Sequence, residues 1–170
     1  MRLILFLPFL YLIPNLVSGQ NLEDFVLTKT HEKGTLYHIK EIELDASCKK
    51  TDFTIDFTYL KTQDEDSVRA LMTLKSRSIK GKPNAISFSF SESEINWDEE
   101  KIGLLYVSKK KKDWETRIEI SLTEDEFIQL LNAGNLEINW RSVDFECEAS
   151  LPKKYRESYQ IFAELLRYNE

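Results

Sequence analysis

Apolar and polar side chains alternate along several stretches of the chain. The alternation is clearest over Phe53–Tyr59, Ile86–Phe90 and Trp114–Ile120, where large or β-branched residues occupy every second position. A period of two residues predicts β-strands that are buried on one face and open to water on the other. Further strands are predicted over Phe25–Thr30, Leu36–Ile39, Val68–Leu74, Ile102–Val107 and Leu136–Trp140. The pattern of Val68–Leu74 would also suit a helix, and its strand neighbours favour a strand.

Two segments carry the period of a helix instead. Thr123 and Glu126 have the spacing of a capping box, in which each side chain bonds the main-chain N–H of the other. Gly134 follows the apolar positions of this segment and is suited to the left-handed conformation that ends a helix. The second helix is predicted near the end of the chain, where Ser150 would cap it and Pro152 would occupy its first turn. Its apolar positions are Tyr155, Tyr159, Phe162, Ala163 and Leu166.

Short turns between successive strands favour antiparallel pairing. The expected fold class is therefore α+β: a mainly antiparallel sheet of about seven strands, with a short inserted helix and a C-terminal helix packed on it. The polar segment Glu92–Lys101 is predicted to be a loop that buries Trp97. A change of phase at Arg141–Ser142 is interpreted as a β-bulge.

The start of the chain has the layout of a secretory signal peptide. An apolar run, Leu3–Ile13, follows the positive charge of Arg2, and Val17 and Gly19 precede a predicted cleavage site before Gln20. The alternative is an uncleaved membrane anchor, but Pro8 and Pro14 interrupt the run. We expect residues 1–19 to be removed on export, to the periplasm or outside the cell. Residues 20–170 would then form a single domain with no transmembrane segment.

Cys48 and Cys147 are the two cysteines of the chain. In an oxidising compartment such a pair most simply forms a disulfide. Two buried free thiols are an alternative. A catalytic cysteine would need a paired histidine, and neither cysteine lies near one in the sequence.

The net charge of −6 becomes −7 once Arg2 is removed. An acidic protein of this kind does not favour nucleic acid, which attracts a positive field. The strongest local feature of opposite sign is the run Lys109, Lys110, Lys111 and Lys112. It has two interpretations: a hairpin tip that lysine keeps soluble, or a site for a membrane surface or another polyanion.

Motifs that carry chemistry are scarce. His31 and His38 do not have the spacing of a zinc site, and the sequence contains no glycine-rich phosphate loop or nucleophile elbow. We therefore predict no cofactor, no metal site and no catalytic residues. The favoured hypothesis is a non-catalytic binding or interaction domain whose partner is a protein or a small ligand. Candidate surface anchors are Trp97, Trp140 and Tyr159, beside the terminal helix. The alternative from another class is a small hydrolase with carboxylates on its loops.

Overall fold

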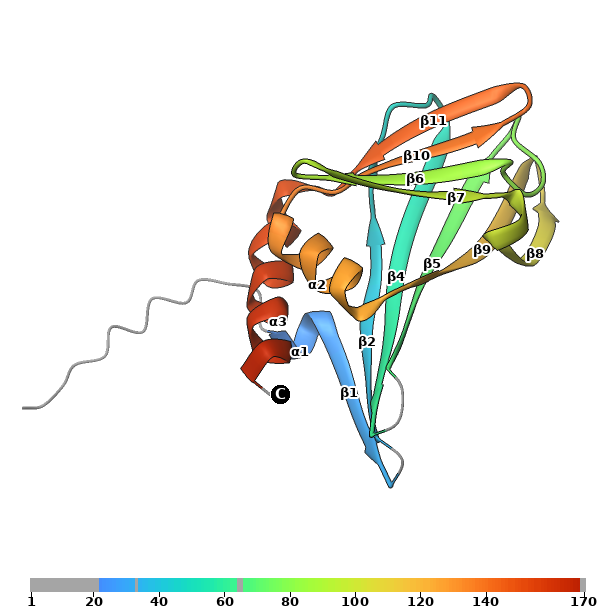
Figure 1. Ribbon diagram of the computed structural model, residues 1–170. Helices are drawn as coiled ribbons and strands as arrows, with labels where there is room; N and C mark the ends of the chain where they lie inside the picture. The colour runs from blue at the N-terminus through green and yellow to red at the C-terminus, as the bar shows by residue number, and fades with distance from the viewer. Residues whose placement is uncertain (1–21, 33, 64–65, 169–170) are drawn as a thin grey trace, which may run out of the picture.

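The computed structural model describes residues 22–32, 34–63 and 66–168 of the chain. In these residues the strands form two antiparallel sheets, one of six strands and one of five (Figure 1). The six-stranded sheet contains, in spatial order, β1 (Val26–His31), β2 (Gly34–Glu43), β4 (Thr51–Thr62), β5 (Ser67–Ser76), β9 (Asp113–Leu122) and β8 (Gly103–Lys110). The five-stranded sheet contains β3 (Asp45–Ala46), β11 (Phe145–Ser150), β10 (Glu137–Ser142), β6 (Ala85–Phe90) and β7 (Ser93–Asp98).

The helical segments are short. They are α1 (Leu22–Phe25), α2 (Glu124–Ala133), α3 (Arg156–Tyr168) and two single turns of 3₁₀ helix, η1 (Glu99–Lys101) and η2 (Lys153–Tyr155). The capping box of α2 is confirmed, with Thr123 Oγ1 accepting from the Glu126 N–H at 3.2 Å and Glu126 accepting from the Thr123 N–H at 2.8 Å. Gly134 ends this helix at a φ of +63°. The predicted C-terminal helix is confirmed as well, but it begins at Arg156, and Ser150 lies in β11 instead of capping it.

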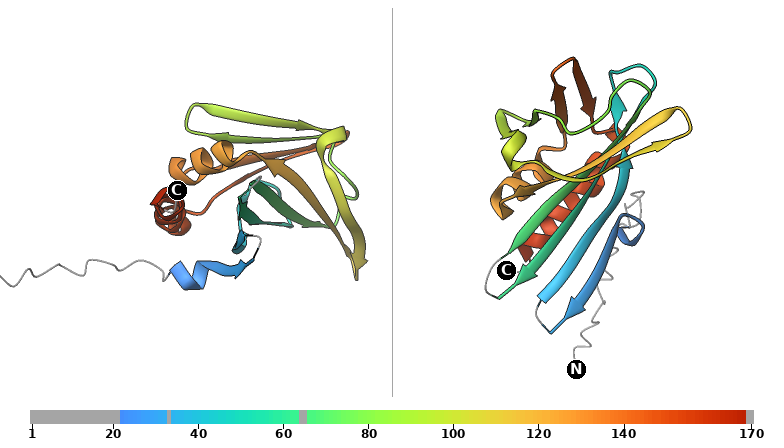
Figure 2. Two further views of the ribbon diagram at one scale, coloured as in Figure 1. Left: turned by 60° about the horizontal axis from the view of Figure 1, so that its bottom comes forward. Right: turned by 90° about the vertical axis from the view of Figure 1, so that its right-hand side faces the viewer.

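The apolar faces of the two sheets face each other, and α2 and α3 fill the open side between them (Figure 1; Figure 2). Between the sheets, the rings of Phe53 and Trp140 meet edge to face at 5.7 Å. On the helical side, Phe127 of α2 lies 5.4 Å from Phe57. Burying each of these large side chains stabilises the fold by roughly 2–3 kcal/mol. The alternation in the sequence therefore specifies which face of β4, β6 and β9 points inward.

The chain does not complete one sheet before it starts the other. It crosses between the sheets after β2, β3, β5, β7 and β9. The last of these crossings contains α2, so that this helix joins β9 of the six-stranded sheet to β10 of the five-stranded sheet. The strands of each sheet consequently come from separated parts of the sequence.

Three predictions about the strands need correction. The expected single sheet of about seven strands is two sheets, because the period of two does not say which sheet receives a strand. The expected loop at Glu92–Lys101 contains β7, an edge strand that pairs with β6 and buries Trp97 between polar neighbours. The expected bulge at Arg141–Ser142 is a hairpin: β10 ends at Ser142, the chain turns, and β11 begins at Phe145. The strand prediction for Val68–Leu74 is confirmed by β5.

The predicted signal peptide, residues 1–19, lies outside the described residues, so cleavage before Gln20 and a domain over 20–170 stay predictions. Among the helices of residues 22–32, 34–63 and 66–168, none has the length and apolar character that crossing a bilayer demands.

Candidate binding groove on the five-stranded sheet

Cys48 and Cys147 form the predicted disulfide, with their Cα atoms 5.7 Å apart. Cys147 is buried on the inner face of β11, and Cys48 lies in the segment after β3. Next to the disulfide, the Ser47 N–H donates to the Glu148 main-chain oxygen at 2.8 Å, and the Glu148 N–H donates to Ser47 Oγ at 3.2 Å. The disulfide and these two bonds hold β3 and the segment after it against β11.

The lysine run lies at a hairpin tip, as its polar character predicts. Lys111 and Lys112 form the turn between β8 and β9. Lys110 Nζ is 3.0 Å from both carboxylate oxygens of Glu115, and Lys109 Nζ lies 5.2 Å from the centre of the Trp114 ring. Two of the four lysines therefore contact neighbours within this hairpin.

The three aromatic residues predicted as surface anchors belong to the core. Trp97, Trp140 and Tyr159 are 6%, 0% and 0% exposed. Trp97 packs on Phe88 with ring centroids 5.0 Å apart, and Tyr159 meets Phe57 edge to face at 6.2 Å. The large aromatic surface that suggested binding anchors fills the space between sheets and helices instead.

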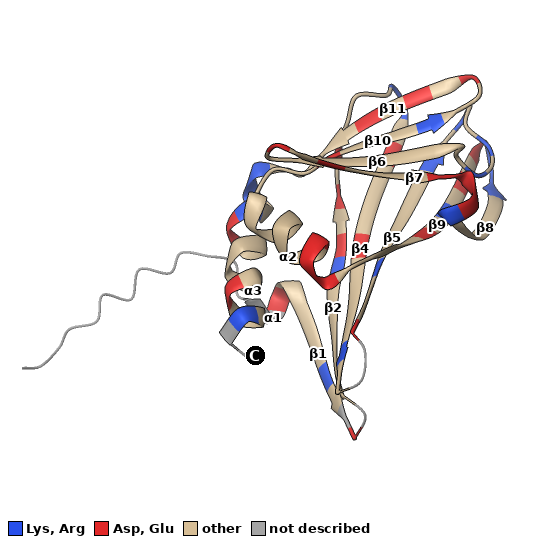
Figure 3. Ribbon diagram, viewed as in Figure 1, with Lys and Arg blue, Asp and Glu red and all other residues tan. Residues whose placement is uncertain are grey.

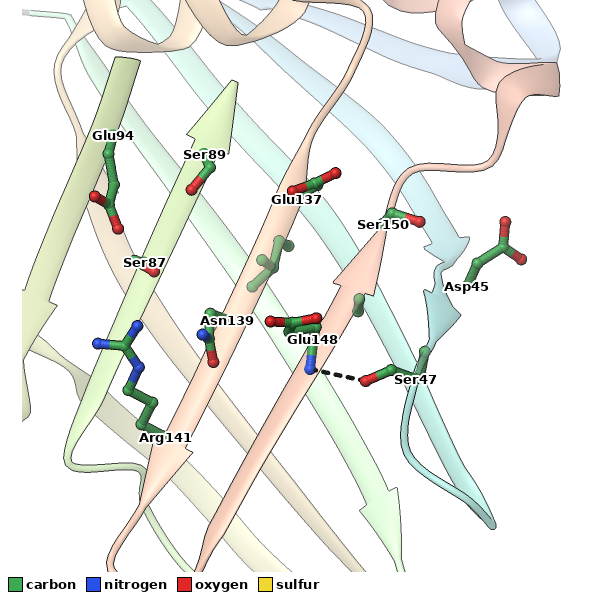
Figure 4. A pocket seen from close by; sticks show the side chains of 13 residues that line it. Asp45, Ser47, Ser87, Ser89, Glu94, Glu137, Asn139, Arg141, Glu148 and Ser150 are labelled. Atoms are coloured by element: carbon green, nitrogen blue, oxygen red, sulfur yellow. Dashed lines mark hydrogen bonds between the residues drawn. The ribbon is translucent and has the colours of Figure 1, made fainter. Parts of the chain in front are cut away.

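The outer face of the five-stranded sheet is hollowed into a groove of about 430 Å³ (Figure 4). Its lining consists mainly of short hydroxyl side chains, acidic side chains, an amide and one arginine: Asp45, Ala46, Ser47, Ser87, Ser89, Glu94, Glu137, Ile138, Asn139, Arg141, Glu148, Ala149 and Ser150. All five strands contribute to it or flank it, because residues two apart on each strand point to the same face.

Strand register arranges the groove in rows that run across the strands. One row reads Glu94, Ser89, Glu137, Ser150 and Asp45, from β7 to β3. The next row places Asn96, Ser87, Asn139 and Glu148 side by side. Serine is much shorter than glutamate, so the serine positions form dips between longer polar side chains. The groove follows from this alternation of long and short residues.

Two groups in the second row have unused hydrogen-bonding capacity. Ser87 is only 4% exposed, and its hydroxyl has no hydrogen-bond partner among the described residues. Its cross-strand neighbour Asn139 donates from Nδ2 to Glu146 at 2.8 Å, while Asn139 Oδ1 has no partner in the same part of the chain. Buried polar groups are nearly always paired in folded proteins. Asn139 Oδ1 is such a buried atom without a partner among the described residues, and the hydroxyl of Ser87 beside it is also free to bond a molecule in the groove.

The charges of the groove are unbalanced. Asp45, Glu94, Glu137 and Glu148 make no ion pair or side-chain hydrogen bond within the described residues. Arg141 is the basic residue of the lining. Its Nε donates to Glu146 at 3.0 Å, and Glu146 is not one of the four groove carboxylates. Hydrogen bonds from Asn139 and Arg141 lower the pKa of Glu146. Figure 3 shows where acidic and basic residues lie on the strands of the five-stranded sheet.

A second hollow, on the outer face of the six-stranded sheet, contrasts with the groove. Its volume is about 300 Å³. Arg117 lies across it and contacts Asp56 at 2.6 Å, Thr73 at 2.7 Å and Glu41 at 3.6 Å. Burial raises the pKa of Asp56, and the charge of Arg117 opposes that shift. The carboxylates of this hollow have cations of their own, which makes the cluster a structural network instead of an open site.

Sequence reasoning missed the groove, although one signal was present. The serines of Ile86–Phe90 identify a polar face on β6. No local pattern, however, shows that β6 lies between β7 and β10, or that β3 and β11 extend the same sheet. The row of acidic residues is assembled by strand order alone.

Neither a metal site nor a relative identifies the ligand. In the described part of the chain, no three side chains of His, Cys, Asp or Glu gather closely enough to hold a metal ion. No protein-family model, no curated protein and no solved structure matches this chain. The chemistry of the groove is therefore the guide to function.

Proposed function

We propose that the protein is a non-catalytic binding domain that works outside the reducing cytosol and holds its ligand in the groove of the five-stranded sheet. The observation that carries this proposal is a pair of unpaired polar groups on the groove floor, the hydroxyl of Ser87 and the buried Oδ1 of Asn139. A buried polar group without a partner costs about 1–3 kcal/mol. A ligand that donates a hydrogen bond to Asn139 Oδ1 recovers this free energy on binding.

Rigidity of the groove supports the same function. Its walls are side chains on paired strands, and the Cys48–Cys147 disulfide fixes the edge formed by β3 and β11. A preformed site loses little conformational entropy on binding, which favours affinity. The disulfide also supports action in an oxidising compartment, because such bonds persist mainly outside the cytosol.

A tryptophan placed in the groove tests the proposal. Ser89→Trp puts a large side chain between Glu94 and Glu137, whereas Ser121→Trp makes the same change at an exposed position of β9 in the other sheet. A mixed library of peptides, amines and sugars is screened by ligand-observed NMR. We expect its hits to bind the wild type and Ser121→Trp but not Ser89→Trp, and to shift the amide signals of Ser87 and Asn139. A screen in which no compound distinguishes the two variants contradicts the proposal.

One observation favours a second function, binding to an anionic membrane surface. Leu104, Leu105 and Tyr106 are 47%, 44% and 40% exposed on β8, at the edge of the six-stranded sheet. They precede Lys109–Lys112 on the same hairpin, and apolar side chains next to basic ones suit the interface of an anionic bilayer. Co-sedimentation with phosphatidylserine vesicles that is lost on Leu105→Ser would support this function. Equal sedimentation with neutral vesicles would contradict it.

A further inference from the structure

We infer that the groove of the five-stranded sheet binds a basic peptide segment that carries a cationic side chain at about every third residue. This inference rests on the proposed function and specifies its ligand. The four groove carboxylates, Asp45, Glu94, Glu137 and Glu148, have no cationic partner within the described residues. Some exposed carboxylates elsewhere have one, as in the pairs Asp52–Lys75 and Asp113–Arg77, whereas four unpaired carboxylates lie together in this groove.

The carboxylates are spread along the groove instead of converging on one point. In the row that crosses the sheet, Glu94 lies on β7, Glu137 on β10 and Asp45 on β3, with one strand between each pair. Neighbouring strands are about 4.8 Å apart, so these acidic positions recur about every 10 Å. The absence of a metal-binding cluster in the described part of the chain agrees with this spacing. Separated negative charges match several separate ammonium or guanidinium groups.

An extended peptide has a matching repeat. Its rise is about 3.1 Å per residue in the polyproline II conformation, which turns once every three residues. Basic side chains at every third position therefore lie on one side of the peptide, roughly 9 Å apart. That repeat is close to the spacing of the acidic positions in the groove.

The uncharged groups of the groove favour a peptide over a simple polyamine. Ser87 has an unpaired hydroxyl and Asn139 an unpaired Oδ1 within the described residues, both in the row beside Glu148. The amide N–H groups of a peptide are donors located between its charged side chains, whereas a polyamine has methylene groups there. The groove lining contains no aromatic residue, which disfavours nucleobases, since these bind by stacking.

The test is a calorimetric titration with a short acetylated and amidated peptide of Lys-Pro-Ser repeats. We compare the wild type with Glu94→Gln/Glu137→Gln/Glu148→Gln and with the control Glu100→Gln/Glu157→Gln/Glu164→Gln. Both triple variants change exposed glutamates and lose the same charge, but the control residues lie outside the groove. We expect the groove variant to bind at least about tenfold more weakly and the control to stay within about twofold, because close charge pairs dominate over the overall field. Thermal melting checks that both variants are folded.

The other outcomes overturn the inference in distinguishable ways. Equal weakening in both triple variants would mean general attraction to an acidic protein. Spermine that binds more tightly than the peptide, and only to an intact groove, would identify a polyamine site. No binding of the peptide, together with library hits that Ser89→Trp abolishes, would refute the basic ligand and leave the proposed binding function standing.

Discussion

The indole Nε1 of Trp97 donates a hydrogen bond to the main-chain oxygen of Ser121, at 3.2 Å. Trp97 belongs to β7, the edge of the five-stranded sheet, and Ser121 belongs to β9 of the six-stranded sheet. The bond thus joins the two sheets directly, and the ring packs on Phe88 beneath the sheet. Trp97, which the sequence suggested as a binding anchor, therefore links the two sheets and stabilises the fold.

Trp97→Phe is expected to lower the free energy of unfolding by about 1–2 kcal/mol, since it removes the cross-sheet donor and part of a buried ring. Chemical denaturation measures this change. Trp114→Phe is the matched control: Trp114 is half-buried and its ring contacts Lys80 and Lys109. Trp114→Phe is expected to lower the free energy of unfolding by less than about 1 kcal/mol. Equal losses in the two variants would argue against a stabilising bond to Ser121.

Arg117→Met is expected to destabilise the protein by about 3–5 kcal/mol at neutral pH, because it leaves the buried carboxylate of Asp56 without its cation. Burial raises the pKa of Asp56, and loss of Arg117 removes the group that opposes this shift. The protonated form is therefore favoured in the folded variant. The deficit relative to wild type is expected to shrink as the pH falls from 7 towards 4.

The control for this change is Lys75→Met, which breaks an exposed pair with Asp52 at 3.5 Å. An exposed pair contributes about 0–1 kcal/mol. Denaturation curves at several pH values measure both variants. A deficit of Arg117→Met that grows on acidification would contradict the assigned role of Asp56.

Glu115→Gln is expected to cost about 1 kcal/mol at neutral pH, because Glu115 accepts hydrogen bonds from Tyr106 at 2.8 Å and from Lys110 at 3.0 Å. These bonds lower the pKa of Glu115 from its ordinary value of 4.5. A lowered pKa gives stability that is present above the unfolded value and lost as the pH falls through the folded value. The difference between wild type and variant is therefore expected to decrease as the pH falls below 4.5 and through the lowered pKa of Glu115. A difference that does not depend on pH would show that the charge of Glu115 has no role.

Removal of the disulfide by Cys48→Ala/Cys147→Ala is expected to lower stability by up to about 4.7 kcal/mol, the entropy of closing a loop of this length. The effect is also local, since Ser47 and Glu148 bond each other beside the disulfide. Hydrogen exchange of their amides is expected to accelerate more than exchange in β2 and β4. Unchanged protection at Ser47 and Glu148 would show that β3 is held without the disulfide.

Much of the fold could be predicted because local patterns determine it. Alternation identified the inner faces of β4, β6 and β9, and the capping box located α2. β7 was missed because Ile95 and Trp97 are too few to outweigh the polar residues around them. The pairing of strands into two sheets was out of reach, since it depends on contacts between distant segments.

The groove, like the fold, was predictable only where local sequence patterns determine it. Ser87 and Ser89 could be assigned to an open face from the sequence, but their neighbours could not. Glu94, Glu137 and Asp45 are far apart in the chain and meet in one row through strand order. Trp140 and Tyr159 were misjudged because aromatic residues occur both in cores and at binding surfaces.

The repeated crossing of the chain between the sheets determines how the protein can be divided. A cut in the segment 77–84, between β5 and β6, would yield an N-terminal piece that still owns β3 of the opposite sheet and a C-terminal piece that owns β8 and β9. Neither layer exists as a contiguous gene fragment. A single sheet of this protein therefore cannot be expressed, duplicated or exchanged as one continuous segment of the chain.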